Sequence, residues 1–291
     1  MEEEASSRFR DLINDFFIRS EFLYEGQTIS KVWNRICICM DILQNTERAC
    51  VSFFSKNKED ISYLELYGFF QSLYLQQDSV ERLYKTIVDN NFKIKKIAEL
   101  DTISKYRNCY AGHPIDKKEN KQVTSHGLAS YVTDDFHLQT YSWGDNGGLS
   151  NIKLKEVYKN QENEIDKLLK VMIKKLETMI QEKIDKLKTI DTNIDMNWGL
   201  FSGSFYNRDV PMAEHHFNGL KEKVKKIMSE VISIFGGKLE EAQTMDVLFS
   251  ELDYCLENFP GFDYNVMNNR IYLYFLENKL EELKLFFEEL P

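Results

Sequence analysis

The sequence predicts an all-α fold: an up-and-down four-helix bundle with a β-hairpin inserted before its last helix, followed by a smaller C-terminal helical unit. Three observations lead to this prediction. Apolar residues recur at three- and four-residue steps over long stretches, which is the period of an amphipathic helix. The 291 residues include only four prolines that could interrupt such helices. One short segment, residues 127–143, instead alternates in the manner of a hairpin.

The apolar spacing supplies four candidate helices for the bundle. Asp60 is a reasonable N-cap for the second helix, and the third ends before Gly112 and Pro114. The fourth helix is rich in Lys and Glu around its apolar stripe, so a coiled-coil seam is the alternative to a core helix. The expected helices span residues 29–56, 60–89, 92–110 and 154–188.

The segments around these helices divide the chain into three expected parts. Gly127–Trp143 contains two short alternating runs, which favours a β-hairpin, and Gly144–Gly148 is a loop. The helical pattern breaks at residues 193–211, where we place a domain boundary or a long connection. Further helices are expected over residues 212–235, 239–258 and 264–290. The expected domains are an N-terminal extension (1–28), the bundle (29–192) and a C-terminal helical domain (193–291).

The composition is that of a globular protein, with 43% hydrophobic and 29% charged residues. No apolar run approaches the length of a membrane span, and the acidic start lacks the basic character of a signal peptide. We therefore expect a cytoplasmic protein without a membrane partner. The five cysteines form no C-x-x-C pair, which favours buried, reduced thiols over a disulfide framework or a zinc site.

The charge of the chain is uneven. A net charge of −10 argues against broad, nonspecific binding to a nucleic-acid backbone. Between Arg82 and Lys121, however, ten basic and five acidic residues give a local charge of +5. A solvated helix face is the ordinary explanation of such a run. This run also surrounds the one histidine motif that we single out.

That motif lies in the turn after the third expected helix and reads RNCYAGHP at residues 107–114. An Arg, a polar residue and, a few positions later, a His resemble the signature of the HEPN superfamily. The run YGFFQSLYLQQD at residues 67–78 is similar to the second helix of a bacterial HEPN group. In that group an R-N-x-x-x-G-H-P turn closes the third helix, and the hairpin and the long Lys/Glu-rich helix also fit it. The resemblance covers about residues 29–189.

The residues of the motif suit RNA cleavage. An RNA strand carries its own nucleophile, the ribose 2′-hydroxyl, so a ribonuclease without metal needs a base, an acid and a cation for the phosphorane charge. His113 can carry a proton near neutral pH, and Arg107 offers a planar cationic fork that fits two phosphate oxygens. Asn108 adds a neutral donor beside Arg107. One chain supplies one such His, and HEPN nucleases typically act as dimers with both motifs facing a shared groove.

Two further features of the second expected helix have alternative interpretations. In the HEPN bundle a polar residue on that helix can reach the Arg-His turn, so Asp78 is a candidate to orient His113; a helix-surface salt bridge is the alternative. The aromatic residues Tyr67, Phe70 and Tyr74 fit a core or a dimer interface better than a base-stacking platform.

Other candidate sites are weaker. His215 and His216 are adjacent and therefore point about 100° apart on a helix, with no third ligand at helical spacing. His126 and His137 lie in the expected hairpin and could meet only if they pair across the strands. Gly144–Gly148 lacks the Lys-Ser/Thr of a phosphate-binding loop. We therefore expect neither a metal nor a cofactor.

The function favoured by the resemblance is a metal-independent endoribonuclease of a bacterial toxin–antitoxin or anti-phage system. RNA is then the substrate, the protein is a homodimer, and a protein partner or antitoxin is expected. The alternative is a non-catalytic HEPN module that binds a protein partner or a nucleotide. Fold alone does not decide between the two, because the site carries the function.

Overall fold

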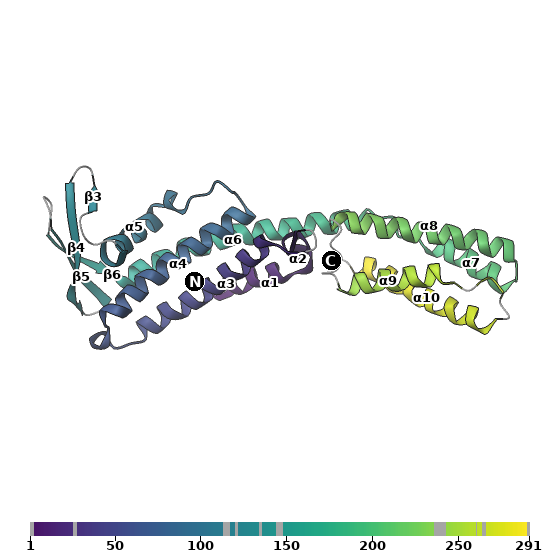
Figure 1. Cartoon of the computed structure of the whole chain (residues 1–291), viewed down its shortest axis with the longest axis horizontal. Coiled ribbons are helices and arrows are strands. Elements are labelled where there is room, and N and C mark those ends of the chain that lie inside the picture. The colour runs from purple at the N-terminus through teal and green to yellow at the C-terminus, as the bar shows by residue number, and fades with distance from the viewer. Residues whose placement is uncertain are drawn as a thin grey trace. The chain divides into compact units, whose positions relative to one another are not determined.

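The computed structural model describes residues 3–25, 28–112, 117–119, 122–133, 136–143, 148–235, 243–259, 261–263 and 266–289 (Figure 1). Within these ranges the chain is mostly helical and carries a small antiparallel sheet, which confirms the predicted helical character. The chain divides into two compact units. The first contains residues 1–13 and 29–176, and the second contains residues 14–28 and 177–291.

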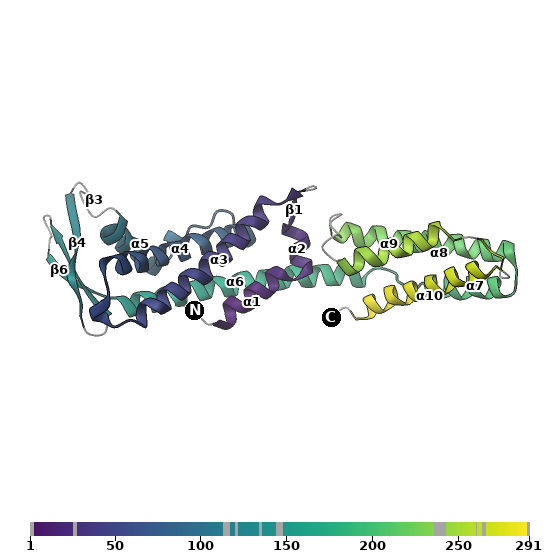
Figure 2. The ribbon, with the colours of Figure 1, turned by 60° about the horizontal axis from the view of Figure 1, so that its bottom comes forward.

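The helices of the first unit alternate in direction, as Figure 2 shows for α3 and α4. Ser62 caps α4 through a reciprocal capping box: the Glu65 amide donates to Ser62 Oγ (3.3 Å), and the Ser62 amide donates to Glu65 Oε2 (2.6 Å). Asp60 was the N-cap expected from the sequence. It lies instead in a short 3₁₀ turn before the helix, so this prediction was wrong. The helices are α1 (Glu3–Asn14), α3 (Lys31–Phe54), α4 (Tyr63–Ile87), α5 (Ala98–Arg107) and the first part of α6 (Leu154–Lys188).

The predicted hairpin is present within a larger sheet. Its two strands pair antiparallel, and Gly127 lies opposite Tyr141. A Cβ atom at Gly127 would lie 2.2 Å from the Tyr141 ring, so any larger residue there would require the Tyr141 side chain to move. The last strand leads directly into α6, so Gly148, which the sequence assigned to a loop, begins a strand. The strands, in sheet order, are β3 (Lys117–Glu119), β4 (Gln122–Thr133), β5 (His137–Trp143) and β6 (Gly148–Lys153).

The core of the first unit explains why α3 and α4 are rich in aromatic residues. Phe53 stacks on Phe69 with ring centroids 4.7 Å apart, and Phe54 contacts Tyr158 of α6 at 5.5 Å. Phe136 completes the cluster at 5.1 Å from Phe54. Its backbone has a φ of 60°, which costs a bulky residue about 1–3 kcal/mol, and the ring contacts offset this strain.

The apolar stripe of α6 is part of this core. Ile165, Leu169, Met172 and Leu176 are almost fully buried within the chain. Because this seam is already covered inside the unit, α6 is a core helix, and the coiled-coil alternative is not needed.

The second unit contains more helix than the sequence predicted. Residues 193–211, expected to be a boundary or connection, hold helix α7. The glycines Gly199 and Gly203 lower helix propensity, but Phe201 and Phe205 lie one turn apart and are fully buried, so packing outweighs propensity. The helices are α2 (Phe16–Phe22), the rest of α6, α7 (Asp195–Tyr206), α8 (Val210–Ile234), α9 (Gln243–Glu257) and α10 (Met267–Glu288).

The division of the chain differs from the domain limits expected from the sequence. The boundary falls inside α6, after Leu176, and residues 14–28 join the second unit instead of forming an extension. Phe17 stacks on Phe235 at 5.6 Å, and Lys183 Nζ donates to the Phe17 carbonyl at 2.9 Å. Two short strands, β1 (Tyr24–Glu25) and β2 (Thr28–Ile29), pair at the end of this segment.

Candidate functional site

The motif begins where α5 changes its backbone geometry. The sequence predicted a helix over 92–110, whereas the α-helix covers Ala98–Arg107 after a short 3₁₀ turn at Ile94–Lys96. Asn108–Gly112 then form a π-helical turn. Single π turns are rare and occur frequently at functional sites, because the wider turn redirects the side chains that follow.

The guanidinium of Arg107 is held by neutral groups. Its Nη2 donates to Gln71 Oε1 at 3.2 Å, and its Nη1 donates to Asn108 Oδ1 at 3.1 Å. Its central carbon lies 4.7 Å from the centre of the Tyr74 ring. Nε is buried and has no hydrogen-bond partner among the described residues. Within the described part of the chain, no carboxylate therefore neutralises this half-buried cation.

A buried glutamine network holds α5 against the bundle. Gln77 Nε2 donates to the Leu100 carbonyl at 3.2 Å and to Gln161 Oε1 at 2.7 Å. Ser104 Oγ donates to Gln77 Oε1 at 2.6 Å. Gln161, in turn, donates to the Leu73 carbonyl at 3.0 Å. These bonds link α4, α5 and α6, so the start and middle of α5 are fixed before the chain reaches Arg107.

The four site residues predicted from the sequence do not all lie together among the described residues. Arg107 and Asn108 lie together, as expected, and the Asn108 amide oxygen accepts from the guanidinium. His113 lies outside the described residues. Asp78 forms an ion pair with Arg82 of the same helix at 2.8 Å, and both side chains are exposed. Of the two alternatives for Asp78, the helix-surface salt bridge is therefore the one that the described residues show.

The basic segment around the motif contains three cations that pair with a carboxylate one helical turn away. Lys85 pairs with Glu81, and Lys105 pairs with Asp101 at 2.9 Å, in both cases one helical turn apart. With the Asp78–Arg82 pair, these contacts resemble an ordinary solvated helix face. Arg107 differs from these cations because its described contacts are amides and an aromatic ring.

The aromatic residues of α4 are divided between the core and the surface. Phe70 is fully buried in the core, whereas Tyr67 and Tyr74 are exposed, as are Tyr63 and Leu64. Sequence reasoning did not assign Gln71 and Tyr74 to Arg107. The available signal was the helical spacing of residues 67, 71, 74 and 78, which puts their side chains on one face.

A second histidine lies beside the motif turn. The His126 ring meets the Tyr110 ring edge to face, with centroids 5.8 Å apart. From the sequence, His126 was expected to meet His137 only if the two residues paired across the hairpin. The strand register pairs His126 with Ser142 and His137 with Thr133, so the two histidines do not face each other.

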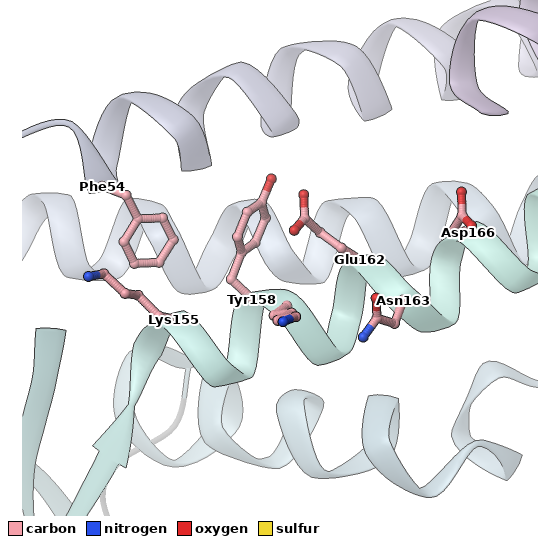
Figure 3. A pocket seen from close by; sticks show the side chains of 7 residues that line it. Phe54, Lys155, Tyr158, Glu162, Asn163 and Asp166 are labelled. Atoms are coloured by element: carbon pink, nitrogen blue, oxygen red, sulfur yellow. The ribbon is translucent and has the colours of Figure 1, made fainter. Parts of the chain in front are cut away.

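An open groove lies beside α6 in the first unit and is a competing site. It has a volume of about 510 Å³, and Figure 3 shows Tyr158, Glu162 and Asp166 extending from α6 toward the same side. Burial raises the pKa of Tyr158, and the neighbouring Glu162 raises it further, so this hydroxyl stays protonated and cannot act as a base. Asp166 is paired with Lys170 at 2.7 Å. Tyr158 and Asp166 therefore do not support a catalytic role for this groove.

Among the described residues, no helix has both the length and the apolar character that crossing a membrane requires. No protein-family model, no curated protein and no solved structure matches the chain. The resemblance to the HEPN superfamily therefore depends only on residues 67–78 and 107–114. The placement of the side chains is the remaining source of information on function.

Proposed function

We propose that the protein is a metal-independent endoribonuclease of the HEPN type, acting as a toxin or an anti-phage effector, in which Arg107 and His113 cut RNA at a cleft shared by two copies. The observation that supports this proposal is the environment of Arg107. Its guanidinium contacts Gln71, Asn108 and the Tyr74 ring, and no described carboxylate neutralises it.

This environment suits a phosphate ligand. A cation that is held in place by neutral acceptors keeps its full charge for an anion, and partial burial lowers the screening by water. The planar fork can bind two phosphate oxygens at once. Negative charge increases on those oxygens as the phosphorane forms, so a cation already in position stabilises the transition state more than the ground state.

The chemistry needs two proton carriers. A base takes the proton of the ribose 2′-hydroxyl, and the 2′-oxygen forms a bond to phosphorus. The bond from phosphorus to the 5′-oxygen breaks, and an acid gives a proton to that oxygen. In this proposal the neutral His113 of one copy is the base and the protonated His113 of the other is the acid. The products carry a 2′,3′-cyclic phosphate and a 5′-hydroxyl.

RNA cleavage by the purified protein is expected to persist in excess EDTA, because the proposed steps use only Arg107 and His113. The expected products end in a 2′,3′-cyclic phosphate and a 5′-hydroxyl, and the matched DNA strand resists cutting because it lacks the nucleophile. Gel analysis of end-labelled RNA, with phosphatase and kinase treatment of the products, measures both features. Cleavage that EDTA abolishes and Mg²⁺ restores would disprove this mechanism.

A two-fold homodimer is expected, with the exposed α4 face of Tyr63, Leu64 and Tyr67 in the interface, because Leu64 and Tyr67 lie two turns and one turn before Gln71, which holds Arg107. Leu64→Asp should convert the dimer to a monomer and reduce cleavage strongly. Leu200→Asp, which alters an exposed leucine of α7, is the matched control and should remain dimeric and active. Light scattering and a cleavage assay measure both properties. A monomeric wild-type protein that cleaves RNA would contradict the shared cleft.

A non-catalytic binding module is the second candidate function. The paired basic residues of α4 and α5 and the net charge of −10 favour it, because both reduce the attraction of this surface for RNA. Wild-type protein that leaves total RNA intact under all conditions, while retaining its helical circular-dichroism spectrum, would favour this function over the nuclease.

A further inference from the structure

An apolar groove lies between α9 and α10 in the second unit, which pack side by side (Figure 2). Its volume is about 600 Å³. Tyr254 of α9 is 59% exposed, and Phe275 of α10 is 52% exposed. Ile271 and Cys255 also line the groove, and burial raises the pKa of the Cys255 thiol, which therefore behaves as a small apolar group.

These apolar side chains are not needed by the core of the unit. The opposite faces of the two helices bury Leu252, Leu256, Leu273 and Leu276 almost completely. The groove residues lie on the solvent side, one or two helical turns apart along each helix. Contiguous exposed aromatic and aliphatic surface of this kind marks an interaction site.

The surroundings of the groove are acidic. Residues 243–289 contain three basic and ten acidic residues, and three minus ten gives a net charge of −7. The one lysine that lines the groove, Lys279, lies between two carboxylates, at 2.6 Å from Glu251 and 2.9 Å from Glu282. Two carboxylates on one ammonium leave a negative charge at the rim.

We propose that this groove docks a basic amphipathic helix of a partner protein. Two antiparallel helices with exposed apolar residues at helical spacing form the receptor of helix-in-groove recognition, and the partner would insert its own apolar stripe. Lysines and arginines that flank the stripe would meet the acidic rim. This site is independent of the proposed nuclease activity and gives the second unit a function of its own.

Charge decides between this occupant and two others. A second copy of the chain carries a net charge of −10 and the same acidic groove, so like charges oppose its docking there. An anionic lipid surface would be repelled by the same carboxylates. A basic helix gains from both the apolar and the electrostatic contacts.

Binding of a fluorescent peptide to the full chain tests the proposal. The probe is a helix of about 18 residues, or five turns, with leucines on one face and lysines on the other. Saturable binding that weakens as salt is raised is the expected result. A peptide with the same leucines and with glutamates in place of the lysines should bind at least about tenfold more weakly, because of charge reversal at the rim.

Two groove variants and a control locate the binding site. Phe275→Ala and Tyr254→Ala should each weaken binding of the lysine peptide about tenfold, as expected for central aromatic contacts. Tyr206→Ala removes an equally exposed tyrosine from α7 and should leave the affinity unchanged. Thermal unfolding of each variant checks that the fold is intact.

Several outcomes would overturn the proposal. Equal affinities of the wild type and Phe275→Ala, or of the lysine and glutamate peptides, would show that the groove does not recognise a basic helix. A dimer that Phe275→Ala dissociates would show that the occupant is a second copy. None of these measurements uses RNA, so they succeed or fail separately from the nuclease proposal.

Discussion

His113→Ala is expected to lower the rate of RNA cleavage by about 10²–10⁴-fold, which is the usual contribution of a general acid or base. The fold should remain intact, because the buried core among the described residues is formed without His113. Single-turnover cleavage of a labelled RNA measures the loss, and circular dichroism checks the fold.

Arg107→Ala should lower the rate of RNA cleavage by a similar factor, and Arg107→Lys should not restore this rate. A lysine keeps the charge but cannot reproduce the two parallel donors, nor can it place a flat cation on the Tyr74 ring. If Arg107 serves only as a surface charge, Arg107→Lys will instead cleave like the wild type.

Two controls accompany these variants. Arg35→Ala removes an exposed arginine of α3 and should leave the cleavage rate unchanged. His126→Ala removes the histidine beside Tyr110 and should retain most activity if both proton carriers are His113 residues. A large loss in His126→Ala would mean that the second proton carrier comes from the same chain. Wild-type rates in the His113 and Arg107 variants would mean that the motif is a structural turn.

Gln161→Leu is expected to lower the free energy of unfolding of the first unit by about 3 kcal/mol or more. The Gln161 side chain is fully buried and donates to the Leu73 carbonyl and Gln76 Oε1, and it accepts from Gln77 Nε2. Each of these buried groups would lose a hydrogen bond at a cost of about 1–3 kcal/mol. The corresponding decrease in melting temperature is about 6–12 °C for a unit of this size.

Hydrogen exchange of the α5 amides measures this effect locally, because the two units need not unfold together. Asn163→Leu is the matched control, since Asn163 is exposed on the same helix within the first unit, and it should change stability by less than about 0.5 kcal/mol. Gln161→Leu should also reduce RNA cleavage, because α5 carries Arg107. Unchanged protection of α5 in this variant would show that the glutamine network does not hold the helix.

The candidate site could be predicted from the sequence only in part. The motif RNCYAGHP located Arg107 and Asn108 correctly at the end of a helix. The groups that hold the guanidinium, Gln71 and Tyr74, lie on a helix that is distant in the sequence. Helical spacing places both on one face of that helix, but it does not show that residue 107 packs against this face. For Asp78 the sequence allowed either His113 or a salt bridge on the helix surface. The observed partner is Arg82, four residues later on the same helix.

Most of the helices and the hairpin can be predicted from the sequence, because amphipathic period and alternation are local properties of the chain. The grouping of these elements into two units depends instead on contacts between distant residues. The apolar stripe of α6 runs without a break past Leu176, so nothing local marks a boundary there. Helix α7 forms because Phe201 and Phe205 are buried by distant residues, and residues 14–28 join the second unit because Phe17 packs on Phe235. Such contacts join positions far apart in the chain, and their free energy depends on packing that no window of sequence contains.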